Sequence, residues 1–172
     1  MHTEYSSAEQ LRYMHLLSKE YPTISAAASE IIRIQALLQL PKGTEHFMSD
    51  LHGENAAFIH ILNSASGVIR EKIDQLFDRD VPARERADLA TLIYYPAQKL
   101  PEPKERQEDL HWWYRNTRYR LIDLCRLVSS KHTRDHVRKY MPQSCAYIID
   151  ELLHAHFEDH NKELYYDEIV ES

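Results

Sequence analysis

The chain has 172 residues, of which 43% are hydrophobic, and its formal net charge of −6 comes from 21 basic and 27 acidic residues. This composition is ordinary for one globular domain, and it provides no basic field that would attract a polyanion, so nucleic acid is not an expected partner. Its two cysteines, Cys125 and Cys145, form no CxxC motif, which argues against a zinc ribbon and a disulfide framework and favours a reducing compartment.

The N-terminal stretch MHTEYSSAEQ lacks the basic start and apolar core of a signal peptide, and the sequence contains no run of roughly 18 apolar residues. We therefore expect a cytoplasmic protein without a membrane partner. Only three glycines occur in the chain, whereas the average share is roughly 7%. Because sheets with tight turns use glycine heavily, we expect helices to dominate.

Apolar residues recur at helical spacing along most of the chain. Ser6 and Ser7 precede the first such segment as capping residues, and Pro22 and Pro82 suit the starts of later ones. The polar, proline-rich stretch at 99–109 is predicted to be a loop. Helices are predicted over approximately 6–20, 24–40, 54–64, 68–77, 82–95, 110–128, 136–141, 145–157 and 163–172.

The stretch TEHFMSDLHGE at 44–54 interrupts this helical pattern with a short apolar run, and we predict a strand that ends in a turn. Side chains two positions apart point to the same side of a strand, so Asp50 and His52 are expected to converge at its carboxyl end, where Gly53 permits a sharp turn. A carboxylate and an imidazole together suit manganese, iron or zinc. His46 lies on the same side of the strand and is a candidate for orienting the ligands.

Two donors do not complete a hydrolytic metal site, which needs at least three protein ligands. On spacing alone, a satisfied pair of side chains at a strand end is the favoured interpretation of Asp50 and His52, and metal binding is the alternative. A single strand also cannot satisfy its own backbone groups. Further strands are therefore expected from elsewhere, and an exposed strand edge would favour a homo-oligomer.

The residues from Tyr21 to Phe77 resemble the N-terminal part of the bacterial class III fructose-1,6-bisphosphatases, which are calcineurin-like metallophosphoesterases. The stretches LPKGTEHFMSDLHGE and NSASGVIREK carry the resemblance, which continues more loosely through Ala87–Pro96 and WWYRNTRYRLIDLCR. It implies a gluconeogenic enzyme that removes the 1-phosphate of fructose 1,6-bisphosphate with divalent metal ions, commonly Mn²⁺. The SDLHGE stretch corresponds to the first metal motif, so Asp50 and His52 are implied as metal ligands.

The later motifs of that superfamily, G-D-x-x-D-R-G and G-N-H-D, do not occur in this sequence. We therefore expect the front part of a longer enzyme, truncated before the second metal motif and inactive by itself. The expected fold is mainly α with one or few strands, as the beginning of an α/β metallophosphoesterase sandwich with a helical insertion. Its expected regions are an N-terminal helical region at 1–43, the first catalytic strand and metal motif at 44–54, and a helical region or insertion at 55–172.

Two other patterns have both a functional and a structural interpretation. The string HWWYRNTRYR at 111–120 interleaves aromatic residues with arginines, as surfaces that bind single-stranded nucleic acid do. Because Trp113 and Tyr114 fall on an apolar helical stripe, a packed helix is favoured. His156 and His160 lie one helical turn apart, as in some zinc sites, but Phe157 replaces the glutamate of H-E-x-x-H, so a solvated helix end is favoured.

Two further functions remain open beside the bisphosphatase. One is a non-catalytic helical interaction or regulatory module that retains the D-x-H pattern, and the other is a phosphoesterase acting on a different substrate. A bisphosphatase would have a sugar bisphosphate and the remainder of the same polypeptide as its partners. No motif selects the substrate-binding residues, although some arginines of the 111–120 string are candidates to meet sugar phosphates.

Overall fold

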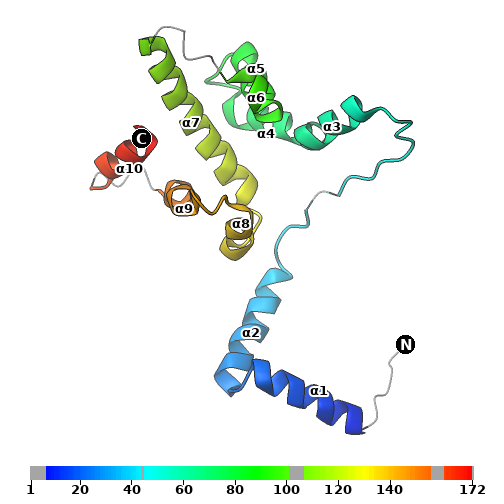
Figure 1. Cartoon of the computed structure of the whole chain (residues 1–172). Coiled ribbons are helices and arrows are strands. Elements are labelled where there is room, and N and C mark those ends of the chain that lie inside the picture. Colours follow the sequence, from blue (N-terminus) through cyan, green and yellow to red (C-terminus); the bar gives the residue numbers. More distant parts are fainter. Residues whose placement is uncertain (1–6, 44, 101–106, 156–160, 172) are drawn as a thin grey trace. The chain divides into compact units, whose positions relative to one another are not determined.

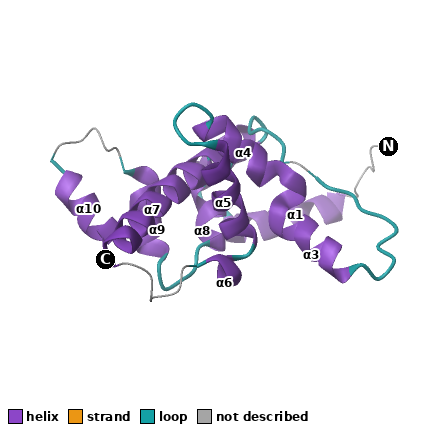
Figure 2. Cartoon of the chain, turned by 90° about the horizontal axis from the view of Figure 1, so that it is seen from above, coloured by secondary structure: helices purple, strands orange, loops and turns teal. Residues whose placement is uncertain are grey.

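The computed structural model describes residues 7–43, 45–100, 107–155 and 161–171. These residues form ten α-helices and one 3₁₀ turn, and they contain no strand, as the helices and loops of Figure 2 show. The mainly helical prediction is therefore confirmed in this part of the chain. The chain divides into two compact units, Met1–Gly43 and Thr44–Ser172, which are described separately.

The first unit consists of two helices, α1 (Ser7–Glu20) and α2 (Ile24–Leu37). The predicted break between them is confirmed at Pro22, and Thr23 then caps α2 because its Oγ1 accepts a hydrogen bond from the backbone N–H of Ala26 at 3.1 Å. Ser6 lies outside the described residues, so its predicted capping role is not seen. Neither helix buries a residue, so residues 7–43 form no core of their own.

The second unit contains the remaining elements (Figure 1). The helices predicted for this unit are confirmed. A further four-residue helix at Pro96–Lys99 was not predicted, although proline suits a first helical position. Of the predicted loop at 99–109, residues 101–106 lie outside the described residues and 107–109 belong to a helix. The elements are α3 (Asn55–Ser64), the 3₁₀ turn η1 (Ala65–Gly67), α4 (Val68–Phe77), α5 (Ala83–Tyr94), α6 (Pro96–Lys99), α7 (Gln107–Ser129), α8 (Arg134–Tyr140), α9 (Ala146–His154) and α10 (Glu163–Glu171).

The core of the second unit lies where α4, α5 and α7 meet. Ile73 is fully buried in α4, and the apolar face that contains it also includes Ile69 and Phe77, at the four-residue spacing of one helical face. Burial of an Ile or Phe side chain contributes about 1.5–3 kcal/mol. The buried cluster comprises Ile73, Phe77, Val81, Leu89, Ala90 and Leu124.

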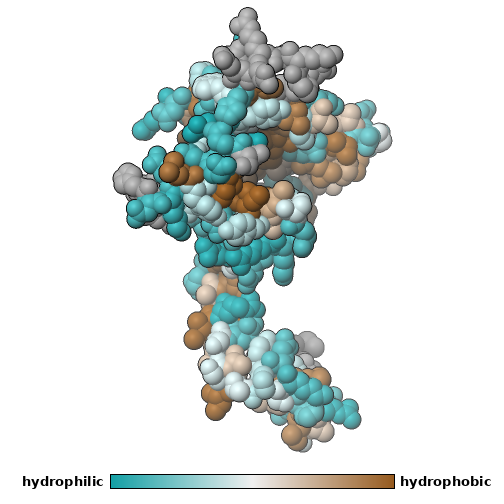
Figure 3. Space-filling view, turned by 60° about the vertical axis from the view of Figure 1, so that its left-hand side comes forward, coloured by the Kyte–Doolittle hydropathy of each residue, from teal (hydrophilic) through white to brown (hydrophobic). Residues whose placement is uncertain are grey.

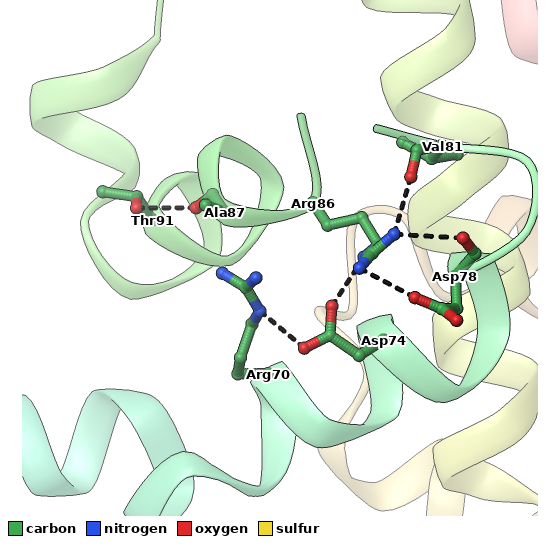
Figure 4. Close-up of polar contacts among 7 residues, drawn as sticks. All are labelled: Arg70, Asp74, Asp78, Val81, Arg86, Ala87 and Thr91. Carbon is green, nitrogen blue, oxygen red and sulfur yellow. Dashed lines mark hydrogen bonds and ion pairs between the residues drawn. The ribbon is translucent and has the colours of Figure 1, made fainter. Parts of the chain in front are cut away.

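A polar network joins α4 to α5 beside this core (Figure 4). The side chain of Arg86 is only 11% exposed, and its Nε donates to Oδ1 of Asp74 at 2.6 Å. Its Nη1 donates to the carbonyl oxygen of Val81 at 2.8 Å, while its Nη2 is paired with Oδ1 of Asp78 at 2.9 Å. The other Asp74 oxygen accepts from Nε of Arg70 at 2.9 Å. Arg86 therefore links the connection between α4 and α5 to both helices.

On another side of α7, Arg126 satisfies the C-terminal end of α9. Its Nη2 donates to the carbonyl oxygens of Leu152 at 2.6 Å and Ala155 at 2.9 Å, in the last turn of the helix, where carbonyl groups have few intrahelical donors. The helix α10 also packs on α7, with Tyr166 and Val170 buried. No helix in the described part of the chain is both long enough and apolar enough to cross a membrane.

Candidate metal centre

The predicted strand at 44–54 is not present. Residue 44 lies outside the described residues, and 45–51 form an exposed segment without regular secondary structure. Phe47 and Met48, which belong to the apolar run that predicted the strand, are 90% exposed and 42% exposed. The physical reason is that a strand needs a neighbour for its backbone N–H and C=O groups, and the described residues supply no second strand.

The D-x-H-G sequence instead forms a tight turn that leads into α3. Its backbone takes left-handed conformations, with φ of 53° at Asp50, 47° at His52 and 75° at Gly53. The N–H of Glu54 donates to the carbonyl oxygen of Leu51 at 2.9 Å, so His52 and Gly53 are the central residues of a turn with two positive φ values, as in type I′ turns. The turn predicted at Gly53 is thus confirmed. Asp and His tolerate this region better than most residues do.

The Asp50 carboxylate and the His52 imidazole are both exposed. Oδ2 of Asp50 accepts a hydrogen bond from Oγ of Ser49 at 3.2 Å. Because neither residue lies in a strand, the alternation that was expected to bring their side chains to one side does not apply here. A carboxylate and an imidazole suit Mn²⁺ as donors, but within the described residues no three His, Cys, Asp or Glu side chains lie close enough together to hold a metal ion.

The metal hypotheses also involve three other histidines, His46, His156 and His160. His46 lies in the exposed segment before the turn, and its role in orienting ligands stays a prediction. His156 and His160 lie outside the described residues, so the alternative zinc pair cannot be placed.

His60 has a structural role that joins α3 to the end of α5. Its Nδ1 lies 2.7 Å from the hydroxyl oxygen of Tyr95, and the two rings are stacked with centroids 6.0 Å apart. Nearby, Nδ2 of Asn63 donates to the carbonyl oxygen of Tyr94 at 2.9 Å. These contacts fix the helix that follows the D-x-H-G turn against the second unit's core helices. The adjacent tyrosines after the apolar stripe of α5 were the only sequence signal for this contact.

The connection between α3 and α4 is a second run of left-handed residues. Ala65, Ser66 and Gly67 have φ values of 47°, 53° and 88°. Only glycine adopts this region without a steric cost, so Ala65 and Ser66 are strained. The run forms a kink between the two helices within the NSASGVIREK stretch, directly before the buried face of α4.

The arginines of the 111–120 string are engaged in contacts between helices. Arg115 pairs with Glu171 at 2.9 Å, and Arg120 pairs with Glu85 at 2.9 Å. Arg118 donates to the backbone carbonyl oxygen of Val170, and the hydroxyl of Tyr119 donates to Oδ1 of Asp167 at 2.7 Å. The packed-helix interpretation therefore accounts for these residues.

An open hollow of about 410 Å³ lies between α5 and α7. Buried Leu89 and Leu92 form part of its wall, together with the indoles of Trp112 and Trp113. Its rim carries both signs of charge, since Arg120 and Lys99 lie there with Glu85 and Asp88. The mixed rim does not select one class of ligand.

Comparison with known proteins identifies the family. The model of the family described as "Firmicute fructose-1,6-bisphosphatase" matches residues 12–172, so the chain belongs to this family. It is 54% identical over 164 residues to a class 3 fructose-1,6-bisphosphatase of Clostridium acetobutylicum. It is 54% identical over 162 residues to the one of Clostridium novyi and 49% identical over 161 residues to the one of Listeria innocua.

These matches cover 94–95% of this chain but only 24–25% of each relative. The chain thus spans about a quarter of the length of the curated relatives it matches. The resemblance found at Tyr21–Phe77 is confirmed and extends much further along the sequence. No solved structure matches the chain significantly, so the metallophosphoesterase sandwich stays a prediction.

Proposed function

We propose that this chain provides part of a metal-dependent, cytoplasmic fructose-1,6-bisphosphatase of gluconeogenesis, which hydrolyses fructose 1,6-bisphosphate to fructose 6-phosphate and phosphate. The observation that supports this most is the match over nearly the whole chain to relatives named for that activity. The remainder of a family-length polypeptide would be its partner. The chain supplies two donors and the relatives are about four times longer, so we expect no phosphatase activity from the 172 residues alone.

Asp50 and His52 are the residues of this chain that we propose as ligands, with Mn²⁺ as the metal. Their carboxylate and imidazole fit the donor preference of that ion. A metal pair, when bound, supplies an activated water and stabilises the charge on the phosphoryl group. The protein's own contribution here is positional, because the Ser49 hydroxyl holds Oδ2 of Asp50 and the turn at His52–Gly53 fixes the backbone between the ligands and α3. His46 is proposed to orient these ligands from the preceding segment.

The test is a chimera in which this chain replaces the matched region of the Clostridium acetobutylicum relative. Phosphate release from fructose 1,6-bisphosphate is measured with Mn²⁺, and we expect activity from the chimera and none from the 172-residue chain. Asp50→Asn or His52→Ala in the chimera should lower activity about 100-fold or more, because each removes a metal ligand.

Two exposed residues outside the turn, Asp80 and His15, give matched controls, and Asp80→Asn or His15→Ala should leave activity unchanged. A folded but inactive chimera would contradict the proposed function. Full activity after Asp50→Asn and after His52→Ala would contradict the proposed ligands while leaving the function standing. Hydrolysis of other phosphomonoesters in preference to fructose 1,6-bisphosphate would favour a phosphoesterase with another substrate.

The alternative function is a non-catalytic helical interaction module. It is favoured by one observation, which is that the D-x-H side chains lie in an exposed turn rather than at the end of a strand. An inactive chimera that still folds and assembles would support this alternative.

A further inference from the structure

An apolar stripe runs along the exposed side of α2. Ile24 is 91% exposed, Ile31 is 56% exposed and Leu38, at the C-cap, is 75% exposed. These three residues are spaced seven apart, and the exposed Ile34 lies between the last two. Brown side chains on the surface of the α1–α2 unit are visible in Figure 3. An apolar surface of this kind marks an interaction site more often than a solvated face.

The spacing of the stripe is that of a coiled-coil seam. If Ile24, Ile31 and Leu38 occupy the a positions of a heptad, Ala27 and Ile34 occupy the d positions. We call these five residues the α2 stripe. Because apolar residues every 3.5 positions face a partner helix with the same repeat, the pattern indicates a helical partner rather than a small ligand.

We propose that the α2 stripe binds the α2 stripe of a second copy of this chain, with the two helices antiparallel. In an antiparallel pair, each a residue packs beside a d residue of the other helix. The two-fold axis then lies between Ile31 and Ile34, so that Ile31 faces the second copy's Ile34, and Ala27 faces the second copy's Leu38. Four residues of the stripe, Ala27, Ile31, Ile34 and Leu38, are therefore complementary to their own copies, as a two-fold interface requires, whereas Ile24 lies at the end of the seam opposite Pro41, beyond the second copy's helix.

Side-chain size favours this antiparallel arrangement over a parallel one. In the antiparallel pair the small Ala27 lies against the large Leu38, so no layer between the two paired segments consists of two small side chains. In a parallel pair Ala27 would face Ala27 and leave a gap, which costs packing energy. Antiparallel helices also place opposite ends of the helix dipoles together.

The residues on the two flanks of the stripe cause no electrostatic repulsion between the two copies. One flank carries Ala28 and Gln35, which are uncharged. On the other flank, the carboxylate of Glu30 accepts two hydrogen bonds from Arg33, at 2.6 and 2.7 Å. This pair carries no net charge, and in the antiparallel register each Glu30 lies beside Leu37 of the second copy rather than beside another glutamate.

The length of α2 predicts a weak dimer. Its 14 residues extend about 21 Å, which is two heptads, and an interface of this size falls below the roughly 1,200 Å² of stable complexes. Sedimentation equilibrium over about a 100-fold range of concentration should therefore show the average mass rising from that of one chain toward that of two.

Matched substitutions test the surface. Ile31→Asp should weaken dimerisation at least about 10-fold, because two carboxylates would enter the seam. Ile32→Asp changes the next residue of the same helix, which is also an exposed isoleucine but lies at position b, and should leave dimerisation unchanged. Circular dichroism checks that both variants keep their helix content, and Ile31→Gln replaces Ile31→Asp if it does not.

Cysteine crosslinking tests the orientation in a Cys125→Ser, Cys145→Ser background. Ala27→Cys and Leu38→Cys chains should form a disulfide when mixed, and neither should do so alone, because the two copies of residue 27 lie about 16 Å apart along an antiparallel pair. A chain that stays monomeric at the highest concentration, equal effects of Ile31→Asp and Ile32→Asp, or crosslinking of Ala27→Cys alone would overturn the proposal.

Discussion

Nε of Arg86 in α5 donates to Oδ1 of Asp74 in α4 at 2.6 Å, and the same guanidinium donates to the backbone carbonyl oxygen of Val81 in the connection between the two helices. One side chain therefore holds a helix, the next helix and the loop between them. Because Arg86 is mostly buried whereas Arg70 on the other Asp74 oxygen is about a third exposed, the two arginines are expected to differ in their effect on stability.

The Nη1 of Arg86 donates to the backbone carbonyl oxygen of Asp78 at 3.2 Å as well as to that of Val81. Arg86→Ala should lower the free energy of unfolding by about 1–3 kcal/mol, because it leaves these two carbonyl groups without this donor beside the core. Arg70→Ala should have a smaller effect, since an exposed ion pair within one helix contributes little. Urea denaturation of the two variants measures both. If both variants lost the same free energy of unfolding, the hydrogen bonds from Arg86 to the backbone would add nothing to stability beyond its ion pairs.

The stability of the second unit should fall in acid through Asp74. Hydrogen bonds from Arg70, and then from Arg86, hold the pKa of the Asp74 carboxyl below its ordinary value. A lowered folded-state pKa gives stabilisation that is fully present above the unfolded-state value of about 3.9 and is lost as the pH falls through the folded-state pKa. Asp74→Asn should therefore be less stable than the parent at neutral pH and show a shallower loss of stability below about pH 4. Urea denaturation at a series of pH values measures this, and parallel pH profiles would contradict it.

Gly53→Ala should loosen the start of α3. No atom lies within 4 Å of the position that an added Cβ would occupy, so the cost comes only from the φ of +75°, and is about 1 kcal/mol. Backbone amide exchange in the first turn of α3 should become about 5-fold faster. Gly43→Ala is the matched control, because that position is equally open and does not have a positive φ. Unchanged exchange in Gly53→Ala would show that the turn does not support α3.

Ala65→Gly should stabilise the second unit by up to about 1 kcal/mol, because it relieves the left-handed strain at the end of α3. The same substitution inside α3, Ala57→Gly, should instead destabilise by about 0.5–1 kcal/mol, since glycine loses more conformational freedom in a helix. Thermal unfolding of the two variants measures the difference in sign. A loss of stability in both would mean that the gain at Ala65 is smaller than the entropic cost.

The helices could be predicted from the sequence because their signals are local. The apolar repeats of α4 and α7, and the prolines before α2 and α5, act within a few residues of the structures they specify. The four-residue α6 is too short for a periodic pattern to identify. The left-handed run at Ala65–Gly67 was missed because neither alanine nor serine signals a positive φ, and only Gly67 pointed to it.

The strand and the metal site could not be predicted as well as the helices, because both depend on groups that are distant in the sequence. Phe47 and Met48 have the composition of a strand, but a strand forms only with a neighbour, and none is present in the described residues. Asp50 and His52 were selected by resemblance to a family motif, whereas spacing alone favoured a structural pair. The turn at Gly53 was predicted correctly because it depends on glycine's own conformational freedom.

The placement of the core has a consequence for how the chain folds. Apart from Leu124 and the half-buried Leu121 of α7, the cluster's residues lie between Ile69 and Tyr94. Contacts so close in sequence cost little loop entropy, so α4 and α5 can associate rapidly. As the polypeptide is synthesised from its N-terminus, this pair can form a nucleus before α7 leaves the ribosome, and α7 then completes the nucleus by docking Leu121 and Leu124 on it.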